Sequence, residues 1–253
     1  MDGLLGKMPP VHDPATVRLA NYVKHGQLPD APTSTERALN AEPRFQMFDN
    51  DRIGDCTCAG VGNAVAFWTA LSGRPDGITV DDVLHAYETI TGYNPTTGAN
   101  DNGAVEIDVL EYWAKVGVGG HTIAGYAAID LMHTNTPVLV ESAIWTFDGA
   151  YLGVALPLTA QGEDVWDVDQ DGGSAAYPGS WGGHCVFAVD YSPAGVVVAT
   201  WGATKLMTWD FFDAYVDEAY AVISDDALNA TSGKTAEGYD LSALRNDLGY
   251  LAN

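Results

Sequence analysis

Residues 50–58, Asn-Asp-Arg-Ile-Gly-Asp-Cys-Thr-Cys, join two different kinds of sequence. Before them the chain is rich in proline, and after them it becomes small and apolar, with hydrophobic residues at helical spacing as far as Leu71. The pattern predicts a helix from Cys56 to Leu71 that is buried on most sides. Backbone amides at the start of this helix would stabilise a thiolate on Cys56 and an oxyanion on a substrate. Cys56 is therefore a candidate nucleophile.

A general base for this cysteine is found in residues 182–191, Gly-Gly-His-Cys-Val-Phe-Ala-Val-Asp-Tyr. The run after His184 predicts a strand, and the preceding pair of glycines, which includes Gly183, would let a ligand approach the backbone closely. The tight turn at 192–195 joins this strand to another at 196–201, so the two are expected to pair as a hairpin. His184 is the candidate base.

The remaining pattern indicates an α+β protein, with helices first and an antiparallel sheet afterwards. Further helices are predicted at 80–90, 104–116, 209–216 and 240–248, and strands at 121–127, 137–144, 185–191, 196–201 and 220–223. Residues 1–45 are interrupted by prolines and predict an irregular arm that packs on its own domain or reaches a protein partner. Residues 46–223 form the predicted body, and 224–253 a tail whose short helix packs on that body.

Composition excludes several classes of function. The 253 residues carry a formal net charge of -23, which disfavours nucleic-acid or membrane binding through a basic patch. Apolar runs are too short for a membrane-spanning helix, and the first residues lack the pattern of an export signal. We therefore expect a cytoplasmic or virion-associated protein. Three cysteines are too few for a disulfide-stapled scaffold.

In their order and spacing these segments resemble the papain-like cysteine peptidase superfamily. The resemblance rests on Asn50 six residues before Cys56, on the strand that starts at His184, and on the run 196–202 that ends in Trp-Gly. The chain is also similar to uncharacterised papain-like proteins of actinobacteria and their phages. The resemblance implies a helical half packed on an antiparallel sheet, with a cleft between them that Trp201 and Gly183 would line. It also implies a thiol-dependent attack on peptides or peptidoglycan stems, with the Asn50 side chain and the Cys56 amide holding the oxyanion.

Two departures from the family pattern keep a second hypothesis open. Ala199 stands where the family has the Asn or Asp that orients the histidine, and Asn50 stands where it has a longer glutamine. Thr200 is the nearest polar neighbour of Ala199, and its hydroxyl is expected to bind a nearby backbone group. Without an orienting acid a catalytic triad slows by orders of magnitude. The alternative is a papain-like module without turnover, used for binding or as a structural component such as a virion protein.

Metal sites are considered and not favoured. A zinc site could use Cys56, Cys58, His184 and Cys185, but His184 and Cys185 are neighbours on a strand and point to opposite faces, and structural zinc favours a C-x2-C spacing. Cys58 is turned away from Cys56 around the helix, so Cys58 and Cys185 are expected in the core. A second candidate follows the opening of a calcium loop. It consists of Asp167, Asp169 and Asp171. The bidentate glutamate that should close such a loop is missing, which favours an acidic surface loop, and we expect no cofactor.

Overall fold

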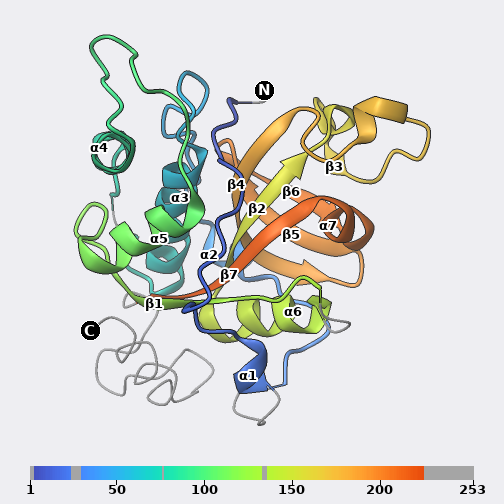
Figure 1. Ribbon diagram of the computed structural model, residues 1–253. Coiled ribbons are helices and arrows are strands. Elements are labelled where there is room, and N and C mark those ends of the chain that lie inside the picture. Colours follow the sequence, from blue (N-terminus) through green and yellow to red (C-terminus); the bar gives the residue numbers. More distant parts are fainter. Residues whose placement is uncertain (1–2, 24–29, 76, 133–135, 225–253) are drawn as a thin grey trace.

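A computed structural model describes residues 3–23, 30–75, 77–132 and 136–224 (Figure 1). The helices are α1 (Ala20–Val23), α2 (Arg37–Ala41), α3 (Cys56–Leu71), α4 (Val80–Thr91), α5 (Glu106–Lys115), α6 (Thr136–Phe147) and α7 (Trp209–Tyr215). The strands are β1 (Ile123–Ala128), β2 (Ala150–Leu156), β3 (Val165–Trp166), β4 (Gly182–Ser192), β5 (Gly195–Thr200), β6 (Ala203–Thr208) and β7 (Val216–Ser224). The helix predicted at 240–248 and the tail from 225 onward lie outside the described residues.

The strands form one sheet with two faces that belong to two hydrophobic cores. Their order is β1-β7-β2-β4-β5-β6-β3, antiparallel throughout except for the parallel pairing of β3 with β6. Because successive strand residues point to opposite faces, Tyr151 packs into the core beneath α3, α4 and α5, whereas Leu152 packs into the core that α6 and α7 complete. The α+β class is confirmed.

Helix α3 begins and ends where the sequence predicts, and glycine sets its distance from the sheet. A Cβ added to Gly60 would lie 3.1 Å from the sulfur of Cys185 on β4 and 3.2 Å from the ring of Tyr151 on β2. Gly60 thus allows the helix backbone to approach both strands closely. This close packing brings the first turn of α3 to the end of β4 where His184 lies.

Local signals at other helix ends are also found in the structure. Thr79 and Asp82 form a reciprocal capping box at the start of α4, which ends at Gly92 in the left-handed conformation. The hydroxyl of Thr208 accepts a hydrogen bond from the amide of Phe211 and caps α7. The predicted hairpin of β4 and β5 is confirmed by the pairing of Ser192 with Gly195.

Three parts of the secondary-structure prediction are wrong. Residues 137–144, predicted as a strand, belong to helix α6. The apolar residues of this helix are buried on almost every side, so its sequence has no amphipathic period. Pro137 lies in the first turn of the helix, where proline is tolerated. Strands β2, β3 and β6 fall in stretches for which no strand is predicted. Finally, the proline-rich arm contains the short helices α1 and α2.

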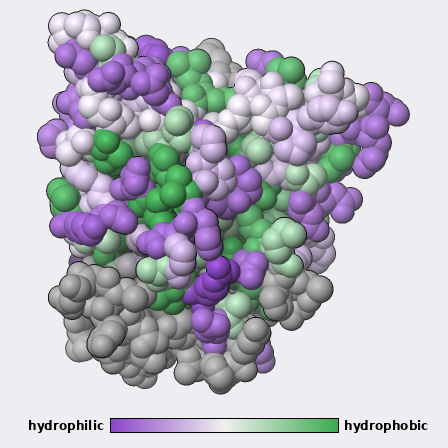
Figure 2. All heavy atoms as spheres, in the orientation of Figure 1, coloured by the Kyte–Doolittle hydropathy of each residue, from purple (hydrophilic) through white to green (hydrophobic). Residues whose placement is uncertain are grey.

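The surface follows from the composition. In Figure 2 hydrophilic residues are spread over the face shown, and hydrophobic ones gather toward its middle. Within the described part of the chain, no helix has the length and apolar character that a membrane crossing requires.

Candidate active site

Cys56 is the first residue of α3, and its side chain is 1 % exposed. The amides of the first helical turn have no partner within the helix, so the positive end of the helix dipole lies at this sulfur. The backbone amides of Cys185 and Gly6 also donate toward the sulfur. Burial nevertheless raises the pKa of Cys56 to about 12. The thiol is therefore protonated at neutral pH in this conformation.

The imidazole of His184 is held on two sides at the start of β4. Its Nε2 lies 2.7 Å from the hydroxyl oxygen of Thr200, and its ring stacks on Trp201 with ring centroids 4.4 Å apart. Nδ1 is buried and has no hydrogen-bond partner among the described residues. Burial, assisted by the positive charge of Lys205, lowers the pKa of His184 to about 3. The imidazole is therefore neutral.

Strand alternation explains why Thr200, and not Ala199, contacts the histidine. Ala199 lies opposite Phe187 in the β4–β5 ladder, and both side chains belong to the core under the helices. Thr200 is the next residue, so its side chain points to the other face, where His184 lies. The expectation that the Thr200 hydroxyl binds a nearby backbone group is wrong. Among the described residues it is the hydrogen-bond partner of the histidine ring.

Asn50 is buried in the loop that leads to α3. Its side-chain amide donates to the carbonyl of Ile53 at 3.1 Å, which fixes the loop before the helix. The same side chain also hydrogen-bonds to the carboxyl group of Asp55. Asp55, next to the cysteine, is fully buried, and this burial raises its pKa well above the ordinary value. The charge of Asp55 contributes to the raised pKa of Cys56.

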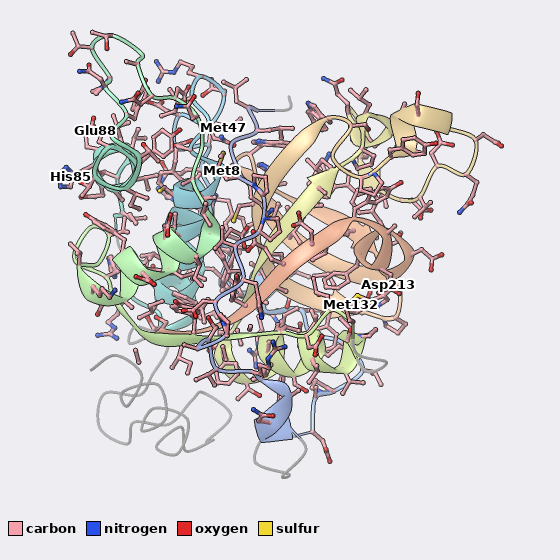
Figure 3. The ribbon with its side chains drawn as sticks, in the orientation of Figure 1. Met8, Met47, His85, Glu88, Met132 and Asp213 are labelled. Atoms are coloured by element: carbon pink, nitrogen blue, oxygen red, sulfur yellow. The ribbon has the colours of Figure 1, made fainter. Side chains whose placement is uncertain are left out.

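The cleft between the helices and the sheet is occupied by the beginning of the chain, residues 3–8, which we call the arm strand. Figure 1 shows it in dark blue between α3 and α5 on one side and β4 on the other, and Met8 is labelled in Figure 3. The amide of Leu4 donates to the Asn50 carbonyl at 2.5 Å, and the amide of Lys7 donates to the Gly183 carbonyl at 3.0 Å. The arm strand thus binds both walls of the cleft.

Further contacts hold the arm strand directly over the cysteine. The carbonyl of Gly6 accepts from the amide of Ala104 at 2.8 Å, and the amide of Met8 donates to the carbonyl of Ala104 at 2.9 Å. A Cβ added to Gly6 would lie 1.7 Å from the carbonyl oxygen of Gly54, two residues before Cys56. Only a glycine fits here. In the sequence, the glycines Gly3 and Gly6, three residues apart in an otherwise irregular segment, are the signal for this close backbone approach.

The segments that carry the predicted site residues lie around the arm strand, but Cys56 and His184 point to different faces of the sheet. Cys56 packs with Cys185 in the core beneath the helices, whereas the His184 ring stacks on Trp201. The helix start with Cys56, the loop with Asn50, the strand start with Gly183 and His184, and the Trp201 corner surround the arm strand. Trp201 itself has a positive φ of 46°, which is uncommon outside glycine. No group of three or more His, Cys, Asp and Glu side chains able to hold a metal ion occurs in the described ranges.

Comparisons with known proteins agree with this geometry at the level of the fold. No family model matches the chain, and no curated protein matches it. Xylellain, a cysteine protease from Xylella fastidiosa, superposes with a TM-score of 0.65 at 13 % identity, covering 88 % of this chain and 96 % of that one. A digestive procathepsin L 3 of Tenebrio molitor gives 0.56 at 13 % identity, covering 88 % and 75 %. A cysteine protease of Carica candamarcensis gives 0.51 at 14 % identity, covering 76 % and 98 %.

Proposed function

We propose that this chain, which has the fold of the papain-like cysteine proteases, hydrolyses amide bonds in peptides or peptidoglycan stems with Cys56 as the nucleophile. The observation that carries the proposal is the place of the sulfur. It lies at a helix start and beside the amide of Cys185, the residue that follows His184. The sulfur thus lies among backbone amides at the start of α3, and the candidate base stands one residue before Cys185 on β4.

Each step of the proposed reaction uses a group already described. Nδ1 of His184 takes the thiol proton while the Cys56 sulfur attacks the substrate carbonyl. The negative oxygen that forms is stabilised by the Cys56 amide and the Asn50 side chain. When the C–N bond breaks, the imidazolium returns its proton to the leaving amine. Water then attacks the thioester, with the imidazole again acting as the base, and releases the acid and the free thiol.

The arrangement described above is a closed state of this enzyme. With the pKa of the thiol raised to about 12 and that of the imidazole lowered to about 3, the imidazole is too weak a base to take the thiol proton, and the arm strand occupies the place of a substrate. The carbonyl of Gly6 faces the amide of Ala104, so the arm strand does not present this bond to the oxyanion donors. Activity therefore requires the arm strand to leave.

Cys56→Ala tests the proposal in a chain whose arm strand is lifted by Gly6→Ala. Release of new amines from mixed peptides and from purified peptidoglycan is expected to fall by about 10³-fold or more, because the nucleophile is lost. The matched control is Cys58→Ala, two residues further along the same buried helix, which should keep the activity. If iodoacetamide fails to label Cys56 selectively near neutral pH in the lifted chain, the proposal is refuted.

Thr200 is expected to act as a positioning residue for the imidazole. Thr200→Val keeps the shape of the side chain and removes the hydroxyl at His184 Nε2, so kcat/KM should fall about tenfold or more. The pH profile should change with it, because the stability of the imidazolium depends on this partner. Thr200→Ser restores the hydroxyl and should rescue both values. A Thr200→Val chain with an unchanged pH profile would show that the contact only packs the strand.

One observation favours a second candidate function, a papain-like module that binds or assembles without turnover. The arm strand fills the cleft and hydrogen-bonds to both of its walls. A structural component, in a virion or on another surface, would use the same arrangement permanently. In that case the lifted chain would release no amines from any substrate, although its fold would be unchanged.

A further inference from the structure

The side chain of Lys7 reaches from the arm strand into an acidic pocket. Its side chain is 1 % exposed, and Nζ lies 2.9 Å from Asp217 and 3.1 Å from Glu218, both on β7. Nζ also donates to the carbonyl of Met8 at 3.2 Å. A lysine this deeply buried is uncommon unless acidic partners compensate for its lost hydration. The pocket therefore recognises the ammonium group specifically.

The walls of the pocket come from three elements, α5, β2 and β7. Glu106, at the start of α5, is fully buried, and neither of its carboxyl oxygens has a hydrogen-bond partner among the described residues. Gly153 of β2 forms the remaining wall. A Cβ added to it would lie 2.1 Å from Cε of Lys7 and 2.5 Å from Cγ of Glu218. The glycine thus leaves the room that a long aliphatic stem needs.

The pocket belongs to the cleft and lies next to the nucleophile. The amide of Lys7 donates to Gly183, one residue before His184, and the neighbouring amide of Gly6 donates toward the Cys56 sulfur. Gly153 also pairs with Cys185 in the β2–β4 ladder. A peptide bound in place of the arm strand would therefore put one of its side chains into this pocket.

The carboxyl groups of the pocket favour a cationic side chain. Burial by itself lowers the pKa of Lys7, but the carboxyl groups of Glu106, Glu218 and Asp217 outweigh burial, and the net shift is upward. Burial also raises the pKa of Glu106 and Glu218, which lie close together. Without a cation the negative charge of these buried carboxyl groups would have no opposite charge nearby. A neutral side chain of the same length as lysine could not supply that charge.

We propose that this pocket, formed by Glu106, Gly153, Asp217 and Glu218, is a specificity site of the cleft that takes the lysine or arginine side chain of a peptide substrate when Lys7 leaves. The inference rests on the proposed function, because it names the substrate class of that same cleft. In the closed state Lys7 occupies the pocket, and the cationic side chain of a substrate replaces it.

The first test compares matched peptide amides that carry lysine or norleucine at each position near the scissile bond. In the full chain with Gly6→Ala, lysine should raise kcat/KM about tenfold or more at one position, because norleucine has the same stem without the charge. Glu218→Gln should bring the ratio close to one. Asp213→Asn, an exposed carboxylate on α7 (Figure 3), should leave the ratio unchanged. An equal rate for both peptides would overturn the proposal.

The second test needs no turnover. The free peptide of residues 3–9 is added to the Gly6→Ala chain, and the rate of Cys56 alkylation by iodoacetamide is followed by mass spectrometry. The lysine peptide should protect Cys56 at about tenfold lower concentration than its norleucine counterpart. Equal protection by both, or by neither, overturns the cation pocket. Lysine-selective protection without any hydrolysis keeps the pocket and rejects only the enzymatic function.

Discussion

The Gly6→Ala chain is expected to react with iodoacetamide at Cys56 about a hundredfold faster than the unmodified chain at neutral pH. The added methyl group would lie 1.7 Å from the carbonyl oxygen of Gly54. Because this atom belongs to the backbone of the loop before α3, the arm strand must move away. Overpacking of this kind costs about 1–3 kcal/mol, and each 1.4 kcal/mol changes the open fraction about tenfold.

Exposure of the Cys56 sulfur then increases the rate of alkylation further. Burial is the main reason why the pKa of Cys56 rises to about 12, and only the thiolate reacts. When water reaches the cleft, this pKa should fall toward the ordinary range of cysteine, so the thiolate fraction at pH 7 rises steeply. Alkylation is measured by intact-mass spectrometry over time, at a fixed concentration of reagent.

Two further variants make this result specific. Gly77→Ala adds the same methyl group where nothing lies within 4 Å, so its rate should match that of the unmodified chain. Leu4→Pro removes the amide that donates to Asn50 and should also speed alkylation, although less than Gly6→Ala. If Gly6→Ala reacts no faster than Gly77→Ala, residues 3–8 do not cover the cysteine.

The second large effect is expected for Lys7→Met, which should lower the free energy of unfolding by about 3 kcal/mol at pH 7. The substitution keeps the stem of the side chain but removes the charge that compensates Glu218 and Asp217. Breaking the ion pair leaves the buried carboxyl group of Glu218 without its partner, whereas Asp217 is partly solvated. Urea unfolding followed by tryptophan fluorescence measures the difference through Cm at constant m.

The pH dependence of this loss follows from the signs of the shifts. As the pH falls, the raised pKa values of Glu106 and Glu218 let these groups take up protons early in the variant, so its deficit should shrink. At the alkaline end the unmodified chain loses its advantage instead. The pKa of Lys7 is raised above 10.5, so its contribution is complete below that pH and disappears as the pH rises through the higher folded value.

A surface lysine provides the control for this prediction. Lys115 pairs with Glu111 at 2.7 Å on α5, and both side chains are largely exposed. Lys115→Met should change the free energy of unfolding by no more than about 0.5 kcal/mol, because exposed ion pairs contribute little. Similar losses for the two lysine variants, or a deficit of Lys7→Met that does not vary with pH, would contradict a buried charge cluster.

Elements with a clear local signal could be predicted from the sequence. Helix α3 carries a long apolar run between a polar loop and a glycine, and α4 carries the Thr79 cap, so each could be placed to within a residue or two. Helix α6 could not, because Thr136–Phe147 is buried on nearly all sides and its run of apolar residues has no period that separates helix from strand. Strand β2 could not be predicted for a different reason. Its pairing with β4 and β7 is formed between residues that are distant in the chain.

By itself the sequence determined the α+β class and the candidate pair of Cys56 and His184, because these depend on hydrophobic period, helix starts and the residues next to a strand. Only the tertiary structure decided that Thr200 contacts the imidazole and that Lys7 fills an acidic pocket over the cleft. The physical reason is that both depend on which side chains face each other across elements far apart in the chain. Strand register sets the first contact, and the path of the arm strand between two walls sets the second.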